Sequence, residues 1–423
     1  MTPKTLLLGM AVGLLAVAAA GVAVGLHPPI APLSALPRAF DPGLVAQGES
    51  LAHIGNCVGC HTADGGRPFA GGRALSTPFG TVFATNITPH PETGIGLWSR
   101  EAFGRAVREG VDRNGDHLYP AFPYDHFTRA SDGDLDALYA FIMTRSPMQA
   151  ATPANQMEEP FGFRPLIALW NLLYLEKGPL PEDQSKPAEW NRGRELVEGL
   201  AHCGSCHTPR NALGGQQRDR AFDGAWIEGW YAPPLNAKSR AVQPWTVDEL
   251  FAYLRSGLSK THAAAAGPMG RVTRALAQAR EDEVRAMSVY LASMMADAPA
   301  ARAAPHAKEN AVDSTHAEAA ALFAGACAVC HESGAPMMLE GRPPLAWGTP
   351  LHESASHNTI QVVLHGLRPP AGRSGPTMPA FADTLSDRQV ADIVAYLRAR
   401  YTDKPPWPDL AQSVAQIRRE RGE

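Results

Sequence analysis

Six cysteines in this chain fall into three short runs of one pattern, C-x-x-C-H. The runs are CVGCH, CGSCH and CAVCH, and they begin at Cys57, Cys203 and Cys327 of the 423 residues. Two thiols at this spacing add across the vinyl groups of a porphyrin, and the histidine that follows becomes the proximal ligand of the iron. Because the three runs use every cysteine, the sequence predicts three covalently bound haem c groups.

The predicted haem-binding residues are three pairs of thiols and three histidines. They are Cys57, Cys60, His61, Cys203, Cys206, His207, Cys327, Cys330 and His331. A zinc site would need four nitrogen or sulfur ligands for each metal, and the chain has no further cysteines to supply them. A thioredoxin-like redox pair would not require a histidine after each second cysteine. Haem attachment therefore accounts for the pattern better than either alternative.

An uncharged, largely apolar run from Thr5 to Leu26 follows a single cation, Lys4. A helix of about 20 apolar residues crosses a bilayer, whereas the apolar core of a cleaved secretory signal usually has about 7 to 15 residues. We therefore expect a retained transmembrane helix, with a cleaved signal as the alternative. Lys4 should remain in the cytoplasm, which would place the haem domains on the periplasmic face of a bacterial inner membrane.

Three similar segments follow the apolar run, and each should end in two amphipathic helices. The last helix of each is predicted at 134–142, 283–291 and 389–397, and the helix before it at 98–110, 245–257 and 357–369. The predicted fold is mainly α, with three tandem cytochrome c-type haem domains after the N-terminal transmembrane helix. The expected divisions are an anchor or signal at 1–27, haem domains at 40–150, 186–298 and 313–402, an apolar connector at 151–185 and a tail at 403–423.

The connector contains FGFRPLIALWNLLYL, from Phe161 to Leu175, which is too short to span a bilayer. It could be a buried brace between domains, or a surface that lies against the membrane or a partner subunit. The formal net charge of -4 shows no basic excess that would indicate nucleic-acid binding.

Three Pro/Gly-rich turns, at 85–89, 233–236 and 343–346, recur between the haem motifs and the later helices. A metal-bound histidine usually donates its other ring N–H to a backbone carbonyl. We therefore expect these turns to orient His61, His207 and His331.

Methionine is the expected second axial ligand of the second and third haems. Met269 lies 62 residues after His207, and Met378 lies 47 residues after His331. Both are expected in loops before the last helix, and a His/Met iron moves electrons at raised potential. The predicted iron ligands are therefore His61, His207, Met269, His331 and Met378.

The first segment has Phe122 where a methionine would be expected, 61 residues after His61. Phenylalanine cannot bind iron. The candidates for this position are His126, His117 and Met143, or the site is vacant or holds water. A nitrogen ligand would lower the potential, whereas a vacant site would admit external ligands.

Three longer stretches resemble one family: GTVFATNITPHPETGIGLWS at 80–99, HLYPAFPYDHF at 117–127 and GPTMPAFADTLSDRQVADIVAYLR at 375–398. They are similar to the membrane-anchored triheme cytochrome c subunits of periplasmic alcohol, gluconate, aldehyde and nicotinate dehydrogenases. This resemblance implies a catalytic partner bearing molybdenum, PQQ or FAD, a small iron–sulfur subunit in some complexes, and transfer of electrons to ubiquinone or a terminal oxidase. Phe122 departs from the alcohol dehydrogenase pattern and favours the molybdenum-hydroxylase branch.

No nucleophile constellation or nucleotide-binding loop accompanies the haem motifs, so the chain is not expected to be an enzyme on its own. Two alternatives remain. A peroxidase-type haem enzyme would use an open first iron, and a free-standing electron carrier would have no membrane anchor.

Overall fold

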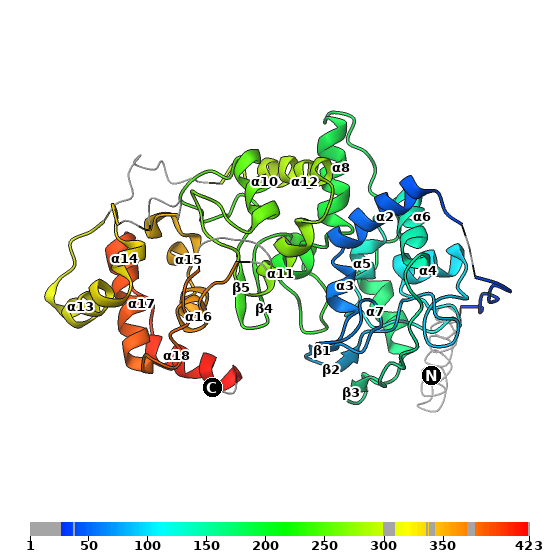
Figure 1. The fold of residues 1–423 in the computed structure, drawn as a ribbon, viewed down its shortest axis with the longest axis horizontal. Helices are drawn as coiled ribbons and strands as arrows, with labels where there is room; N and C mark the ends of the chain where they lie inside the picture. The colour runs from blue at the N-terminus through cyan, green and yellow to red at the C-terminus, as the bar shows by residue number, and fades with distance from the viewer. Residues whose placement is uncertain are drawn as a thin grey trace, which may run out of the picture. The chain divides into compact units, whose positions relative to one another are not determined.

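The computed structural model describes residues 27–36, 39–298, 309–335, 337, 343–369 and 377–421. These residues are mainly helical, with two small antiparallel sheets, as Figure 1 shows. They form two compact units, one of the described residues up to Lys186 with Arg194–Ser205, and one of Pro187–Gly193 with the described residues from Cys206 onward. The mainly helical fold is confirmed for the described residues, while the three domain limits stay predictions.

Within the described ranges, no helix combines the length and apolarity that crossing a bilayer requires. The predicted anchor at Thr5–Leu26 lies outside those ranges.

The first unit contains the first haem motif and the apolar connector. Its sheet has the order β1-β2-β3, with antiparallel pairs that include Ala74 with Phe83 and Gly80 with Met157. Its elements are α2 (Pro42–Ile54), α3 (Cys57–Cys60), β1 (Ala74–Thr77), β2 (Gly80–Phe83), α4 (Arg100–Glu109), α5 (Tyr124–Phe127), α6 (Asp132–Met143), β3 (Gln156–Met157) and α7 (Leu166–Tyr174).

The second unit holds the helices of the second and third segments and the strand pair β4-β5. Helix α8 (Ala188–Glu198) and the short α9 (Gly204–His207) each contribute residues to both units. The others are η1 (Arg218–Arg220), β4 (Ala225–Ile227), β5 (Trp230–Ala232), α10 (Val247–Ser256), α11 (Gly267–Leu276), α12 (Glu281–Met294), η2 (Ser314–His316), α13 (Ala317–Ala326), α14 (Ala328–His331), η4 (Leu345–Trp347), α15 (Thr349–His352), α16 (His357–His365), α17 (Asp387–Tyr401) and α18 (Leu410–Arg421).

Each of the first two segments begins with a helix that crosses the segment's last helix at a glycine. A Cβ on Gly48 of α2 would lie 1.9 Å from the carbonyl oxygen of Ala137 in α6. A Cβ on Gly193 of α8 would lie 2.0 Å from that of Ala286 in α12. Because no side chain fits between these backbones, glycine allows the helices to touch and holds the C-x-x-C-H run close to the last helix.

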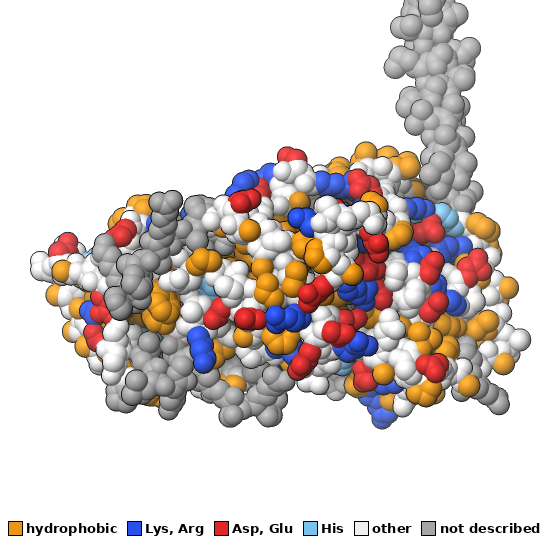
Figure 2. Space-filling view, turned by 90° about the horizontal axis from the view of Figure 1, so that it is seen from above, with side chains coloured by type: hydrophobic (Ala, Val, Ile, Leu, Met, Phe, Trp, Pro, Cys, Tyr) orange, Lys and Arg blue, Asp and Glu red, His pale blue; other side chains and the backbone are white. Residues whose placement is uncertain are grey.

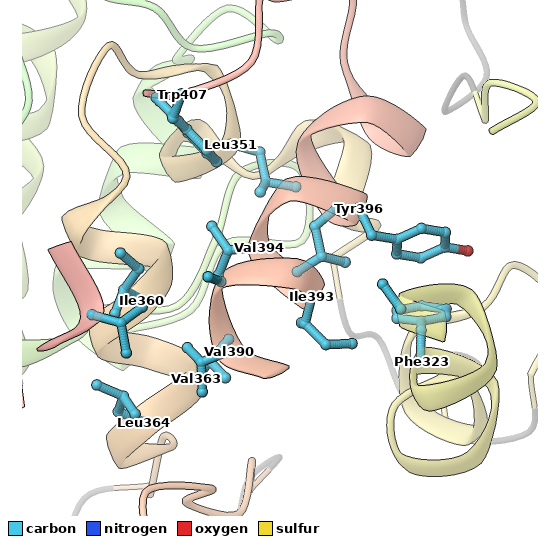
Figure 3. Packing of buried hydrophobic residues seen from close by; sticks show 14 of the residues in the cluster. Phe323, Leu351, Ile360, Val363, Leu364, Val390, Ile393, Val394, Tyr396 and Trp407 are labelled. Carbon is cyan, nitrogen blue, oxygen red and sulfur yellow. The ribbon is translucent and has the colours of Figure 1, made fainter. Parts of the chain in front are cut away.

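The third segment has its own apolar core, drawn in Figure 3. Ile360 and Leu364 of α16 pack with Val390 and Val394 of α17, and all four are fully buried. Trp407, after α17, closes the cluster. The third segment therefore has a core of its own. Truncating one of its buried leucines to alanine would typically cost about 2–5 kcal/mol of stability.

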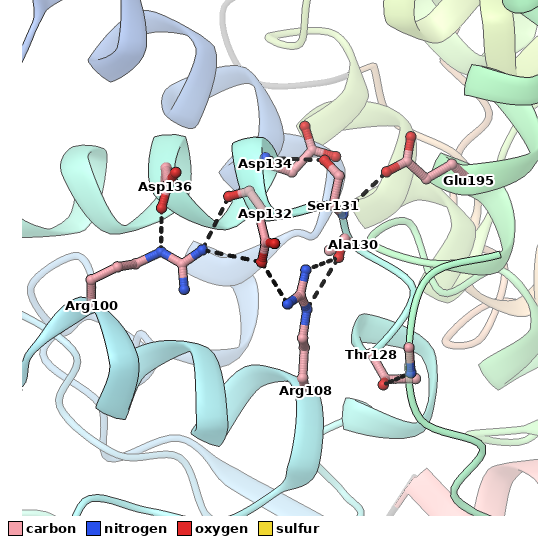
Figure 4. A network of polar contacts seen from close by, with 10 residues as sticks. Arg100, Arg108, Thr128, Ala130, Ser131, Asp132, Asp134, Asp136 and Glu195 are labelled. Atoms are coloured by element: carbon pink, nitrogen blue, oxygen red, sulfur yellow. Dashed lines mark hydrogen bonds and ion pairs between the residues drawn. The ribbon is translucent and has the colours of Figure 1, made fainter. Parts of the chain in front are cut away.

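Side-chain caps begin two of the three last helices, α6 and α17. The Ser131 hydroxyl accepts a hydrogen bond from the Asp134 amide at the start of α6, and Ser386 forms a complete capping box with Gln389 at α17. Figure 4 shows how α6 is also tied to α4, because the Arg108 guanidinium lies 2.7 Å from Asp132 and donates to the Ala130 carbonyl.

Helix α7 corrects one expectation. Leu169, Leu172 and Leu173 are 56%, 63% and 56% exposed, so the interpretation of the connector as a buried brace is wrong for this face. Elsewhere the surface is mixed: on the face drawn in Figure 2, acidic and basic side chains are interspersed.

Candidate haem sites

Each C-x-x-C-H run forms one short turn of helix. In the first, the His61 amide donates to the Cys57 carbonyl at 2.9 Å, and in the third the His331 amide donates to Cys327 at 3.0 Å. Such a turn presents two thiols and the following histidine together. Burial raises the pKa of the Cys57 thiol to about 12, so this residue lacks the low pKa of a reactive redox thiolate.

Two of the three histidines predicted to be proximal ligands have the expected contact with a backbone carbonyl. The Nδ1 atoms of His61 and His207 each lie 2.7 Å from a backbone carbonyl oxygen, that of Thr85 and that of Pro233 respectively. Burial lowers the pKa of both imidazoles, and only the hydrogen bond to the carbonyl opposes this shift. The neutral ring, with Nδ1 protonated and Nε2 as the electron-pair donor, is the form that binds iron. The equivalent bond of His331 stays a prediction.

The third haem motif borders a partly open cavity of about 390 Å³. Cys327, Cys330, His331 and Met378 all line it. The rest of the wall is largely aliphatic, with Pro343 and Pro344 from the turn that was expected to orient His331. Two thiols, one imidazole and one thioether around an apolar cavity are the donor set of a His/Met haem c, so the residues present fit the group.

Part of this cavity wall comes from the second segment. Leu258, His262, Ala263 and Ala264 belong to the loop between α10 and α11, yet they line the cavity of the third motif. His262 is fully buried and stacks on Trp245, with ring centroids 3.4 Å apart. Burial lowers the pKa of His262 to about 4, so its ring is neutral near pH 7.

Hydrogen bonds between β5 and α16 hold the second and third segments together. The Asn358 side chain accepts from the Tyr231 amide at 2.9 Å and donates to the Tyr231 carbonyl at 2.7 Å. Gln361 donates to the carbonyl of Gly229, which lies in the turn just before β5. These contacts explain how a loop of the second segment reaches the cavity of the third.

The helices α4, α10 and α16 each end at a glycine with positive φ. The values are 63° at Gly110, 76° at Gly257 and 66° at Gly366, a conformation that glycine adopts without strain. Phe122, Met269 and Met378 each follow these glycines by twelve residues. This register supports the equivalence of Phe122 with the two predicted methionine ligands.

The two methionines are presented in different ways. Met378 pairs with Leu367 through two backbone hydrogen bonds of 2.8 and 2.9 Å. Met269 lies in the first turn of α11, so the expectation of a loop at this residue is wrong. Pro268 occupies the start of that helix, where proline is well accommodated because its missing N–H would have no partner.

The candidate ligands of the first site have different surroundings. The centroid of the His117 ring lies 5.4 Å from that of the His27 ring. His126 instead faces the stretch before the second motif, and its Nδ1 lies 2.9 Å from the Glu198 carbonyl oxygen. Met143 is buried at the end of α6. His126 thus has the same kind of Nδ1 bond to a carbonyl that orients His61 and His207.

Comparisons with known proteins agree with this donor set. Residues 314–397 match the family model described as cytochrome C oxidase, cbb3-type, subunit III. The chain is 36% identical over 404 residues to the gluconate 2-dehydrogenase cytochrome c subunit of Pantoea cypripedii, covering 89% of this chain and 90% of the relative. It is 34% identical over 402 residues to the fructose dehydrogenase cytochrome subunit of Gluconobacter japonicus, covering 88% and 82%.

This chain belongs to the family of dehydrogenase cytochrome c subunits. It is also 46% identical over 388 residues to one subunit of the nicotinate dehydrogenase of Pseudomonas putida, a match that covers 90% of this chain and 32% of the relative. The cytochrome c subunit therefore spans about a third of that protein and most of the other two.

Membership confirms that this cytochrome c subunit is an electron-transfer component rather than the catalytic one, and that it carries covalently bound haem c. Sequence reasoning missed the helices α2, α8 and α13 that begin the segments, although the apolar residues preceding each motif were available as a signal. It also missed His262, because only packing brings this residue to the third cavity.

Proposed function

We propose that the chain carries three haems and passes electrons from the catalytic subunit of a periplasmic dehydrogenase to ubiquinone or a terminal oxidase. The observation that carries the proposal is the third cavity, where Cys327, Cys330, His331 and Met378 line one apolar space. Haem c bound there supplies one-electron oxidation and reduction. The repeated motif and the repeated twelve-residue register extend the same assignment to the other two segments.

The protein's own residues prepare each site for this role. The Thr85 and Pro233 carbonyls fix the tautomer of His61 and His207. The largely aliphatic wall of the third cavity surrounds the group with few polar atoms, so less polar rearrangement accompanies a change of charge. The wall that the loop around His262 contributes supports electron exchange between the second and third motifs.

For the partner, a molybdenum hydroxylase is favoured over a quinoprotein or flavin dehydrogenase. The supporting observations are the Phe122 departure and the 46% identity to the nicotinate dehydrogenase subunit, against 36% and 34% for the gluconate and fructose dehydrogenase subunits. For location, the Thr5–Leu26 run supports an inner-membrane anchor with the haems in the periplasm.

Phe122 also supports a second candidate. An iron without a sixth protein ligand can bind peroxide, so a peroxidase-type activity would rest on the first site alone. The two functions differ in their dependence on a partner.

Purification of the tagged chain from its native membranes tests the proposal. We expect a larger subunit bearing molybdenum, quinone or flavin to co-purify, and one of a panel of aldehydes, alcohols, sugar acids and N-heteroaromatic acids to reduce the haems of the complex. A chain that purifies alone and turns over peroxide rapidly would instead support the second candidate.

A further inference from the structure

One face of α7 is a leucine face, formed by Leu166, Leu169, Leu172 and Leu173, that the described protein leaves uncovered. Leu166 is 39% exposed and the other three are more exposed still. No charged residue occurs between Arg164 and Glu176. Single exposed leucines are common on soluble proteins, but a continuous helical stripe of them marks a contact with another apolar phase.

The opposite face of α7 is fixed to the first unit. Ile167 and Ala168 are buried. The Tyr124 hydroxyl donates to Asn171 at 2.7 Å, and the Tyr124 and Trp170 rings meet edge to face with centroids 6.1 Å apart. Because Tyr124 is itself fully buried, the helix is held in one orientation and the leucine face points away from the core.

The start of the described chain is linked by contacts to Arg164, which precedes α7. Pro28 is held by Arg105, which donates to its carbonyl oxygen at 2.7 Å. The neighbouring His27 ring meets that of His117, and Arg164 donates to the His117 carbonyl at 3.3 Å. A continuous set of contacts therefore joins the residue after the Thr5–Leu26 run to the residue two positions before α7.

Cations and aromatic rings flank the leucine face. Arg164 precedes the helix, and Lys177, which is 56% exposed and also pairs with Glu109, follows it. Trp170 and Tyr174 lie between them, with ring centroids 5.1 Å apart. Flanking cations with tryptophan and tyrosine are characteristic of segments at a lipid headgroup boundary, where cations meet anionic lipid.

We propose that the leucine face of α7 lies in the surface of the lipid bilayer, beside the point where the Thr5–Leu26 anchor leaves it. The inference rests on the proposed anchoring and goes beyond it, because it assigns the face of the first unit that meets lipid. A catalytic subunit covering the same leucines is the competing occupant. Such a subunit would not require the end of the apolar run to lie beside them.

Two full-length variants test the inference, Leu172→Cys and Leu213→Cys. Leu213 is the matched control because it is 52% exposed, close to the 63% of Leu172, and lies in the second unit. Each chain is reconstituted into vesicles of phosphatidylethanolamine and phosphatidylglycerol, floated on a density gradient and treated with a charged maleimide. We expect the thiol at position 172 to react at least tenfold more slowly than the thiol at position 213.

The wild-type chain gives a second reading that needs no substitution. In vesicles that contain a lipid with a photoreactive acyl chain, the crosslinked lipid should be found on the peptide that carries residues 166–174. Floating chains with equal maleimide rates and no lipid on this peptide would overturn the inference while leaving the anchor intact. Chains that do not float would reject the anchor and the inference together. Protection that appears in detergent only when the catalytic subunit is added would assign the face to a protein partner instead.

Discussion

Replacing Phe122 with methionine is expected to raise the lowest step of the redox titration by on the order of 0.1 V, within the ~0.8 V that axial ligands span. Phe122 occupies the register of Met269 and Met378, twelve residues after a glycine with positive φ. A thioether at this position would favour the ferrous state. The measurement is potentiometric titration of the purified chain, followed through the haem absorption.

The same variant helps to identify the second axial ligand of the first haem iron in the wild type. If the site is vacant, the wild-type chain should bind carbon monoxide at one haem and Phe122→Met should abolish this binding. If His126 is the ligand, His126→Ala should create such a site. Phe103→Met is the control, because Phe103 is buried in α4 against Tyr139. An electron paramagnetic resonance spectrum of the wild type with three equivalent His/Met haems would contradict the assignment.

The Glu353→Gln variant should be more stable than the wild type at pH 8, by up to about 3 kcal/mol, and equally stable near pH 4.5. Glu353 follows α15, and its side chain is 2% exposed. Neither carboxylate oxygen has a side-chain hydrogen-bond donor among the described residues, and the Arg240 guanidinium lies 3.7 Å away. Burial therefore raises the pKa of Glu353 to about 7, although the charges of Arg240 and Arg398 and the Ser354 backbone amide oppose this shift.

The direction of this pH dependence is set by the number of protons that the folded and the unfolded chain bind. Between pH 4.5 and 7 the unfolded chain releases the proton of Glu353 while the folded chain keeps it, so stability is lost as the pH rises through this window. Glutamine carries no charge and avoids this loss. Thermal unfolding at pH 5 and pH 8 measures the difference, with Glu281→Gln as the control because its carboxylate is largely exposed in an ion pair with Arg255. A gain of the same size at both pH values would contradict the explanation.

The helices that the sequence predicts correctly are those with local signals. Ser131, Thr246 and Ser386 accept capping hydrogen bonds at the starts of α6, α10 and α17, and a cap depends only on residues three positions apart. A local signal gave a wrong prediction at Met269. The Gly-Pro pair before it indicated a loop, but this pair begins α11.

The features that could not be predicted depend on contacts between distant residues. His262 reaches the third cavity because Asn358 and Tyr231 join two segments that are far apart in the chain. The exposure of the α7 leucines depends on which face Tyr124 and Asn171 fix to the core. The hydrophobic pattern gives the length of an apolar segment but not the identity of the surface that covers it.

The central claim is that each C-x-x-C-H run holds one covalent haem, and the intact mass of the mature chain tests it most directly. After acid-acetone extraction, which removes haem that is not covalently bound, the mass should exceed that of the polypeptide by three haem groups, because all six cysteines are committed to thioether bonds. The companion variant Cys327→Ala/Cys330→Ala should lose one group and retain two. A wild-type mass that lacks even one haem would contradict the account.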